Sequence, residues 1–258
     1  MLSINGIEIK PTIFPDKTSQ IWLLPNEVLE PISYSDNSKS FEILWKFEGE
    51  GEIVHLCQLL LLLHSVDNRA KKNLWIRTLP YARQDKEVSN QTTFAFRAFA
   101  WMLNNLDLDE IFIIDPHNYQ LTEELIPDCT ILQVESNIDY TYAECEADNI
   151  VFPDKGASKR YQLTYKNPVI LDKVRDQLTG EITGLKIVSG EVKIGRSYLI
   201  ADDICDGGKT FIETAKILYL YGAKNVHLYV SHGIFSKGLE PLREAGIKRI
   251  FTYDGEVK

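Results

Sequence analysis

The sequence predicts an α/β protein with a mainly parallel sheet flanked by helices. Short apolar runs alternate along the chain with longer stretches of helical periodicity, an order typical of strands joined by crossover helices. Runs such as Glu110–Asp115 and Ser197–Ala201 are apolar at nearly every position between their ends. Both faces of such strands are expected to be buried, as they are in parallel sheets covered by helices on both sides.

The elements expected in the first half follow from these two patterns. Gln20–Leu24 is apolar enough for a short strand, and Ser35–Ser40 is a polar loop. Apolar and polar residues alternate in Phe41–Phe47, which predicts a strand. The other elements expected here are a buried helix at Val54–Val66, a strand at Leu74–Leu79, a helix at Thr92–Leu106 and a strand at Glu110–Asp115.

The second half continues the alternation. Strands are expected at Asn149–Phe152, Pro168–Leu171, Ser197–Ala201, Asn225–Ser231 and Arg249–Tyr253, with helices at Thr210–Tyr221 and Leu239–Ala245. At roughly 150 residues per domain, a chain of 258 residues has room for one or two domains.

The composition is that of a globular protein with an excess of negative charge. Hydrophobic residues make up 44% of the chain and charged residues 25%, which excludes a disordered or fibrous protein. Lys and Arg number 28 against 37 Asp and Glu, so the net charge is −9. Nucleic acids and anionic membranes require clustered positive charge, so neither is an expected partner.

The cysteines and the amino terminus favour a cytoplasmic protein. Cysteines occur at four widely spaced positions without a CxxC pair, so we expect reduced core residues: Cys57, Cys129, Cys145 and Cys205. Met1–Lys10 lacks the charged segment and apolar core of a secretory signal. The longest apolar run, Val54–Leu63, is too short to span a bilayer.

Polar clusters follow several of the predicted strands, at the point where each strand ends. They are Tyr81–Lys86, Asp115–His117, Asp154 and Asp202–Thr210. Ligands of open α/β sheets bind outside the carboxyl ends of the strands. We therefore expect the functional residues of this protein in these four segments.

The segment Tyr198–Thr210 carries the strongest functional signal. An apolar strand delivers Asp202 and Asp203, and a glycine turn then leads directly into a helix. The free N–H groups at a helix start can bind a phosphate, with two acids beside it for sugar hydroxyls or hydrated Mg²⁺. A P-loop is excluded, because that pattern requires glycine where this chain has Asp203.

This segment resembles the loop that binds phosphoribosyl pyrophosphate in type I phosphoribosyltransferases. Leu79–Lys86 resembles the PYxxYARQDR stretch of ribose-phosphate diphosphokinases, the phosphoribosyl pyrophosphate synthetases. Asp115–His117 looks like their DLH motif and Ser231–Ser236 like their THxxFS segment. More weakly, Phe14–Asp16 looks like the start of their FPDGE adenine-binding motif. The resemblance implies two halves of the type I phosphoribosyltransferase fold, residues 1–128 and residues 129–258, each a mainly parallel sheet flanked by helices.

The resemblance also implies a transferase. Such enzymes transfer the β,γ-diphosphoryl group of ATP to the anomeric hydroxyl of ribose 5-phosphate, giving phosphoribosyl pyrophosphate for nucleotide biosynthesis, and AMP. It implies Mg²⁺ as the cofactor, ATP and a sugar phosphate as small-molecule partners, and a homo-oligomer.

Individual roles follow from the same resemblance. ATP would be held by Phe14, Asp16, Arg83, Gln84 and Asp85, and Mg²⁺ by His117 and Asp154. Lys173 and Arg175, in the basic start of a flexible loop, would act in catalysis with His117. The ribose phosphate would be bound by Asp202, Asp203, Asp206, Gly207, Gly208, Lys209 and Thr210.

Two departures from the family pattern leave alternatives open. Lys209 adds a positive charge to a loop that usually reads DTGGT, and Lys17 with Thr18 replaces the Gly-Glu of FPDGE. The acceptor could therefore be a larger molecule ending in ribose 5-phosphate, such as ADP-ribose, which would place the protein in NAD metabolism. A catalytically silent binding or regulatory relative and a base-transferring phosphoribosyltransferase are further alternatives.

Overall fold

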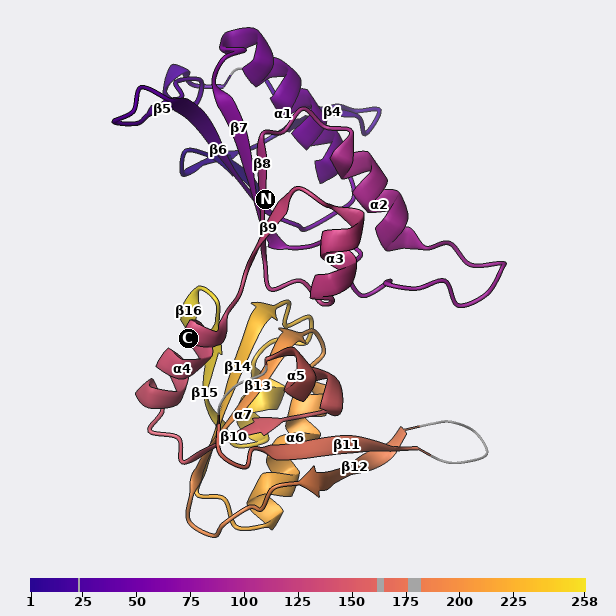
Figure 1. Ribbon diagram of the computed structural model, residues 1–258, viewed down its shortest axis with the longest axis vertical. Helices are drawn as coiled ribbons and strands as arrows, with labels where there is room; N and C mark the ends of the chain where they lie inside the picture. Colours follow the sequence, from indigo (N-terminus) through magenta and orange to yellow (C-terminus); the bar gives the residue numbers. More distant parts are fainter. Residues whose placement is uncertain (23, 162–164, 176–181) are drawn as a thin grey trace. The chain divides into compact units, whose positions relative to one another are not determined.

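The chain divides into two compact units, Met1–Leu132 and Gln133–Lys258. Figure 1 shows the computed structural model, which describes residues 1–22, 24–161, 165–175 and 182–258. Each unit has its own sheet and its own apolar core. The division falls slightly later than the domain boundary expected after residue 128, because Cys129–Leu132 forms β9, an unpredicted edge strand of the first sheet.

The first sheet is parallel in its centre and antiparallel at one edge. Its strand order is β2-β1-β6-β7-β8-β9, with β5 also paired to β6. Strands β6 to β9 are parallel, whereas β1, β2 and β5 run antiparallel to their neighbours. The strands are β1 Leu2–Ile4, β2 Ile7–Ile9, β5 Ile32–Ser33, β6 Lys39–Lys46, β7 Lys71–Thr78, β8 Glu110–Ile114 and β9 Cys129–Leu132.

The hairpin β1–β2 was not expected from the sequence. Ile4 pairs with Ile7, so Asn5 and Gly6 form a two-residue turn, and both have positive φ, 49° and 83°. An Asn-Gly turn of this kind is the strongest short-range signal for a hairpin. Strands of three residues are too short for a clear alternation, so this turn was the only usable indication.

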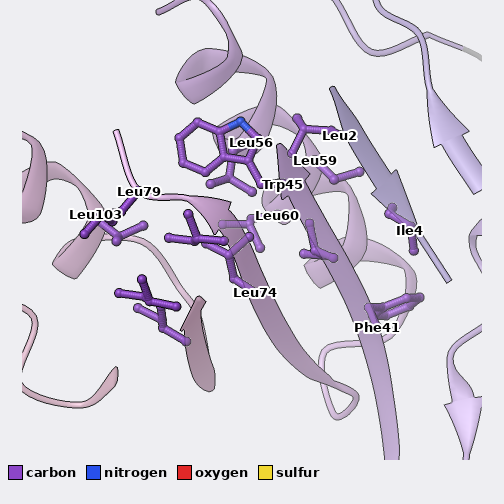
Figure 2. Packing of buried hydrophobic residues seen from close by; sticks show 14 of the residues in the cluster. Leu2, Ile4, Phe41, Trp45, Leu56, Leu59, Leu60, Leu74, Leu79 and Leu103 are labelled. Carbon is purple, nitrogen blue, oxygen red and sulfur yellow. The ribbon is translucent and has the colours of Figure 1, made fainter. Parts of the chain in front are cut away.

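Helices α1 (Glu52–Val66), α2 (Ala95–Asn104) and α3 (Tyr119–Leu125) accompany the first sheet (Figure 1). Leu56 and Leu59 of α1 pack in one cluster with Trp45 and Leu74 of the sheet and Leu103 of α2, and Figure 2 shows this core. None of the described helices, α1 included, is long and apolar enough to cross a membrane.

The strand expected at Gln20–Leu24 is wrong. Only Ser19–Gln20 is extended and paired, as β4 in a small hairpin with β3 (Thr12–Ile13). The backbone N–H of Ile21 instead donates to the side-chain oxygen of Gln58 on α1, at 2.9 Å. A hydrogen bond to a helix side chain therefore replaces the strand pairing that the apolar residues suggested.

The second sheet has the order β12-β11-β10-β13-β14-β15-β16. Its five central strands are parallel, and β12 and β16 add antiparallel edges. Its strands are β10 Asn149–Phe152, β11 Val169–Arg175, β12 Ile182–Ser189, β13 Ser197–Cys205, β14 Asn225–Gly233, β15 Ile247–Thr252 and β16 Gly255–Val257. The helices of this unit are α4 Glu135–Glu144, α5 Lys155–Arg160, α6 Lys209–Leu220 and α7 Glu240–Glu244.

Strand β13 is longer than the sequence predicted. It was expected to end at Ala201, with Asp202 and Asp203 in the following turn. The parallel pairing with β14 continues instead, joining Asp202 to Val230 and Cys205 to Gly233. The two acids therefore lie within the strand, because hydrogen bonds to the neighbouring strand outweigh the low strand propensity of aspartate.

Replacing Leu74 by Ala tests the core of the first unit. Leu74 is fully buried, so its truncation leaves a cavity and is expected to cost about 2–5 kcal/mol of unfolding free energy. The matched control is Leu61→Ala on α1, where the side chain is 72% exposed and the change should stay within about 0.5 kcal/mol. Denaturant unfolding of both variants measures the difference. Equal losses would contradict the packing described here.

Candidate active site

Three carboxylates and two cations meet at the carboxyl edge of the second sheet. Asp154 follows β10, Lys173 lies in β11, Asp202 and Asp203 lie in β13, and Arg160 ends α5. The carboxyl ends of parallel strands lie at one edge of a sheet, which brings these groups together. The sequence predicted four of these five residues for the site. It did not predict Arg160.

Asp203 and Arg160 form a buried ion pair. The Arg160 Nη1 atom lies 2.7 Å from Asp203 Oδ2, and the side chains are only 11% and 5% exposed. A carboxylate buried this deeply must be paired, since desolvation of an isolated charge is costly. Arg160 supplies that pairing.

Asp202 is partly exposed and lies beside Asp203. Its side-chain oxygen accepts a hydrogen bond from the Asp203 backbone N–H at 2.9 Å. Burial, and next to it the negative charge of Asp203, raise the pKa of Asp202 well above its ordinary value, and Asp154 adds to the effect. A cation or hydrogen-bond donor that stabilises the charged form of Asp202 is therefore favoured at this position.

Asp154 and Lys173 form the second ion pair of the cluster. Asp154 is the N-cap of α5, where it accepts the Ala157 N–H at 3.0 Å, and its other oxygen lies 3.4 Å from the Lys173 ammonium. Lys173 was expected in a flexible loop, but β11 extends through Arg175 and pairs with β12. The Arg175 side chain is outside the part of the structure that is described.

The glycine segment after β13 leads into α6. Gly208 is the N-cap of this helix and has a left-handed backbone, with φ of 74°. The N–H groups of the first turn have no carbonyl partner within the helix, so they are available to an anion. Asp206, Gly207 and Thr210 complete the segment predicted to bind the ribose phosphate.

Two lysines lie near this segment in different ways. The Lys209 side chain is 83% exposed and lies 3.9 Å from Glu213, one turn further along α6. Lys237, in the loop after β14, lies over the glycine segment, because a Cβ atom at Gly207 would be 3.6 Å from Lys237 Cε. The aliphatic part of the Lys237 side chain, a residue that the sequence did not point to, therefore lies next to Gly207.

In the first unit, the segment Arg83–Asp85 follows β7 at the carboxyl edge of the sheet. Tyr81 anchors its start: the ring lies 5.5 Å from that of Phe99, and the hydroxyl donates to Glu50 at 2.8 Å. The Gln84 N–H donates to the Tyr81 carbonyl at 2.9 Å, which closes a tight turn. Arg83 and Gln84 are exposed and Asp85 is partly exposed, so this turn presents them for binding.

Asp115 and His117 follow β8 at the same edge of the first sheet. Asp115 is fully buried, has φ of 38°, and accepts a hydrogen bond from the Tyr119 hydroxyl at 2.5 Å. Asn118 caps α3 by accepting the Leu121 N–H at 3.2 Å. His117 is thus held, half-buried, between an anchored acid and a capped helix.

Phe14 and Asp16 lie elsewhere in the first unit. They form the turn between β3 and β4, and Figure 1 shows this hairpin beside α1, away from the segment between β7 and α2. Phe14 lines a groove of about 500 Å³ with residues of α1, among them Leu61 and Leu62. The structure therefore does not bring Phe14 and Asp16 together with Arg83 within one unit.

The chain resembles known proteins over most of its length, although no family model matches it. Ribose-phosphate pyrophosphokinase 4 of Saccharomyces cerevisiae is 32% identical in an alignment of 213 positions that covers 78% of this chain and 64% of the yeast protein. Ribose-phosphate pyrophosphokinase of Saccharolobus solfataricus is 25% identical over 97% of this chain and 85% of its own length. Over most of its length the chain is therefore similar to ribose-phosphate pyrophosphokinases.

The fold agrees with that of a synthetase of known structure. Phosphoribosylpyrophosphate synthetase from Mycobacterium smegmatis matches with a TM-score of 0.72 at 19% identity, over 95% of this chain and 79% of that chain. This similarity, together with the strand pairing, confirms the prediction of two mainly parallel sheets of the type I phosphoribosyltransferase kind. The match to the yeast relative spans less than two thirds of the yeast protein.

One departure from ribose-phosphate pyrophosphokinases has a direct structural consequence. The family motif FPDGE has glycine where this chain has Lys17, and Lys17 adopts a left-handed backbone with φ of 68°. The turn itself is kept, since the Phe14 N–H donates to the Thr18 carbonyl at 2.8 Å and Asp16 accepts from the Thr18 N–H. Lysine therefore occupies a conformation in which glycine has no steric cost.

Replacing Gly208 by Ala tests the turn into α6. Alanine would have to adopt the left-handed backbone conformation of Gly208, and its Cβ atom would lie 3.0 Å from Leu242 Cδ2. We therefore expect the free energy of unfolding to fall by about 1–2 kcal/mol. Gly207→Ala is the matched control, because its Cβ would meet only Lys237 atoms at ordinary contact distance. Thermal unfolding compares the two variants, and a Tm equal to wild type for Gly208→Ala would refute the assigned conformation.

Proposed function

We propose that this protein transfers the β,γ-diphosphoryl group of ATP to the anomeric hydroxyl of ribose 5-phosphate. The observation that carries the proposal is the placement of Asp202 near the carboxyl end of β13, a strand that leads through a glycine turn to the start of α6. Vicinal hydroxyls and a terminal phosphate of one small sugar fit acceptors and N–H donors at that spacing. The ribose-phosphate pyrophosphokinase names of the relatives support the same chemistry.

In the proposed reaction, the anomeric oxygen of the sugar attacks the β-phosphorus of ATP. The bond between that phosphorus and the oxygen bridging to the α-phosphate breaks, and AMP leaves with the electron pair of the bond. The reacting phosphate chain carries several negative charges, so positioning and charge neutralisation contribute most of the rate. In the second unit, which would bind the sugar phosphate, Lys173 beside Asp154 is a cation that could neutralise this charge. Arg83 is the corresponding cation in the first unit.

Mg²⁺ is part of this proposal, with Asp154 and His117 as residues that would hold it. No group of three or more His, Cys, Asp and Glu side chains is arranged as a complete metal site among the described residues. Mg²⁺ bound with nucleotides usually takes one or two carboxylates plus phosphate oxygens, so a complete protein site is not required. The raised pKa of Asp202 fits a nearby cation, which would relieve the repulsion between carboxylates. When bound, Mg²⁺ would neutralise the charge of the transferred phosphates.

The exposed position of Lys209 bears on the larger acceptor. That alternative relied on Lys209 to neutralise a second phosphate, but the side chain extends toward Glu213 and solvent. The names of the two relatives and of the structural neighbour refer to ribose phosphate or phosphoribosyl pyrophosphate, and none refers to ADP-ribose. We therefore propose ribose 5-phosphate itself as the acceptor.

The experiment that tests the function follows AMP release. The protein is incubated with ATP, Mg²⁺ and either ribose 5-phosphate or ADP-ribose. AMP formation with ribose 5-phosphate, together with phosphoribosyl pyrophosphate as product, is the expected result. AMP release only with ADP-ribose would move the protein to the second acceptor, and binding without turnover would identify a silent relative.

Arg83→Ala is expected to reduce turnover by about 10²-fold or more, because it removes a cation from the polyphosphate. Arg69→Ala is the matched control: Arg69 is exposed and precedes β7, at the opposite end of that strand. Initial rates of AMP release compare both variants with wild type. Full activity of Arg83→Ala would remove Arg83 from the site.

Asp202→Asn is expected to raise the KM for ribose 5-phosphate by about ten-fold while the KM for ATP changes little. The amide loses the charged acceptor for the sugar hydroxyls, and one charge-assisted hydrogen bond corresponds to roughly a ten-fold change in affinity. Steady-state kinetics with each substrate varied in turn measures the two constants. A parallel rise in both would indicate a general folding defect instead.

A further inference from the structure

Asp203 and Asp202 are adjacent acids in very different surroundings. The Asp203 side chain is 5% exposed and engaged by Arg160 at 2.7 Å, whereas Asp202 is partly exposed. The Oδ2 atom of Asp203 is therefore directed at a protein group. The two acids therefore differ in burial and in pairing, although they are adjacent in one sequence motif.

Arg160 reaches Asp203 from the helix that Asp154 begins. Asp154 caps the first turn of α5 and Arg160 is its last residue, so the short helix connects the two carboxylates. Its packing is firm, since Ala157 is buried and the Tyr161 ring that follows lies in the core. The position of the Arg160 guanidinium is thus set by the same element that orients Asp154.

We propose that Arg160 is a positioning residue of the sugar-phosphate site: by neutralising Asp203, it leaves Asp202 as the carboxylate that receives the ribose hydroxyls. This inference rests on the proposed function. Without Arg160, the buried charge of Asp203 would lie beside Asp202 and would lack the guanidinium that is paired with it. Asp203 would then move or take up a proton, and its backbone hydrogen bond to Asp202, at 2.9 Å, would no longer be held in place.

The test is a double-mutant cycle on the full chain, with Arg160→Gln, Asp203→Asn and both together. Calorimetry measures the binding of ribose 5-phosphate and of ATP with Mg²⁺ separately. Arg160→Gln is expected to weaken ribose 5-phosphate binding by about ten-fold or more and to leave ATP binding within about three-fold. Arg160→Lys keeps the charge and should recover part of the loss.

The double variant separates positioning from direct contact. It removes both charges, so it leaves none buried and unpaired, and it should bind ribose 5-phosphate more tightly than either single variant. If Asp203 itself held the sugar, the double variant would bind no better than Asp203→Asn, and the proposal would be overturned. Should Arg160→Gln fail to fold, the comparison of the double variant with Asp203→Asn decides alone.

Lys159→Gln is the matched control, because it removes the same charge from an exposed position on the same helix. Its binding of both ligands should equal that of wild type. If Lys159→Gln and Arg160→Gln weakened ribose 5-phosphate binding equally, the effect would be one of overall charge and the proposal would be overturned. A wild-type protein that binds neither ligand would instead refute the proposed function, so the two failures are distinguishable.

Discussion

Crowding of negative charge at the carboxyl edge of the second sheet is the constraint on which the candidate site depends. Parallel pairing of β10, β11 and β13 places the ends of these strands together, and the chain puts an acid at two of them. Burial raises the pKa of Asp202, and the neighbouring charges of Asp203 and Asp154 raise it further. Arg160 and Lys173 each neutralise one of them, which leaves Asp202 to be stabilised by a ligand.

Left-handed backbone conformations occur in several segments that follow strands at the carboxyl edges of the two sheets. Tyr81, Asp115 and Gly208 have positive φ and lie in the segments that follow β7, β8 and β13. Only one of the three is a glycine, so local strain is held by surrounding contacts in the other two. The ring of Tyr81 packs on Phe99, and buried Asp115 accepts the Tyr119 hydroxyl. Rigid anchors thus fix turns whose next residues are presented for binding.

The two lysines near the glycine segment, Lys209 and Lys237, differ in where their side chains lie. Lys209 is the conspicuous departure from the family loop, yet its ammonium is directed along the surface of α6. Lys237 comes from a loop that is distant in sequence and covers Gly207. Proximity in sequence therefore does not decide which lysine side chain packs on the glycine segment.

The sequence by itself determined the fold class, most central strands and the segments in which the site residues lie. Alternation of short apolar runs with helical periodicity indicated β7, β8, β10 and β14, because strands buried on both faces have a composition that few other elements share, and apolar–polar alternation indicated β6. The elements that were missed include β12, α3 and α4 as well as the short edge strands and the six-residue α5, and in the shortest of these a few residues show no periodicity. Only the tertiary structure decided that Asp203 is paired with Arg160, that Lys209 is exposed and that β13 extends through both acids. Those outcomes depend on which side chains and strands meet in space, and such contacts between distant residues leave no local pattern in the chain.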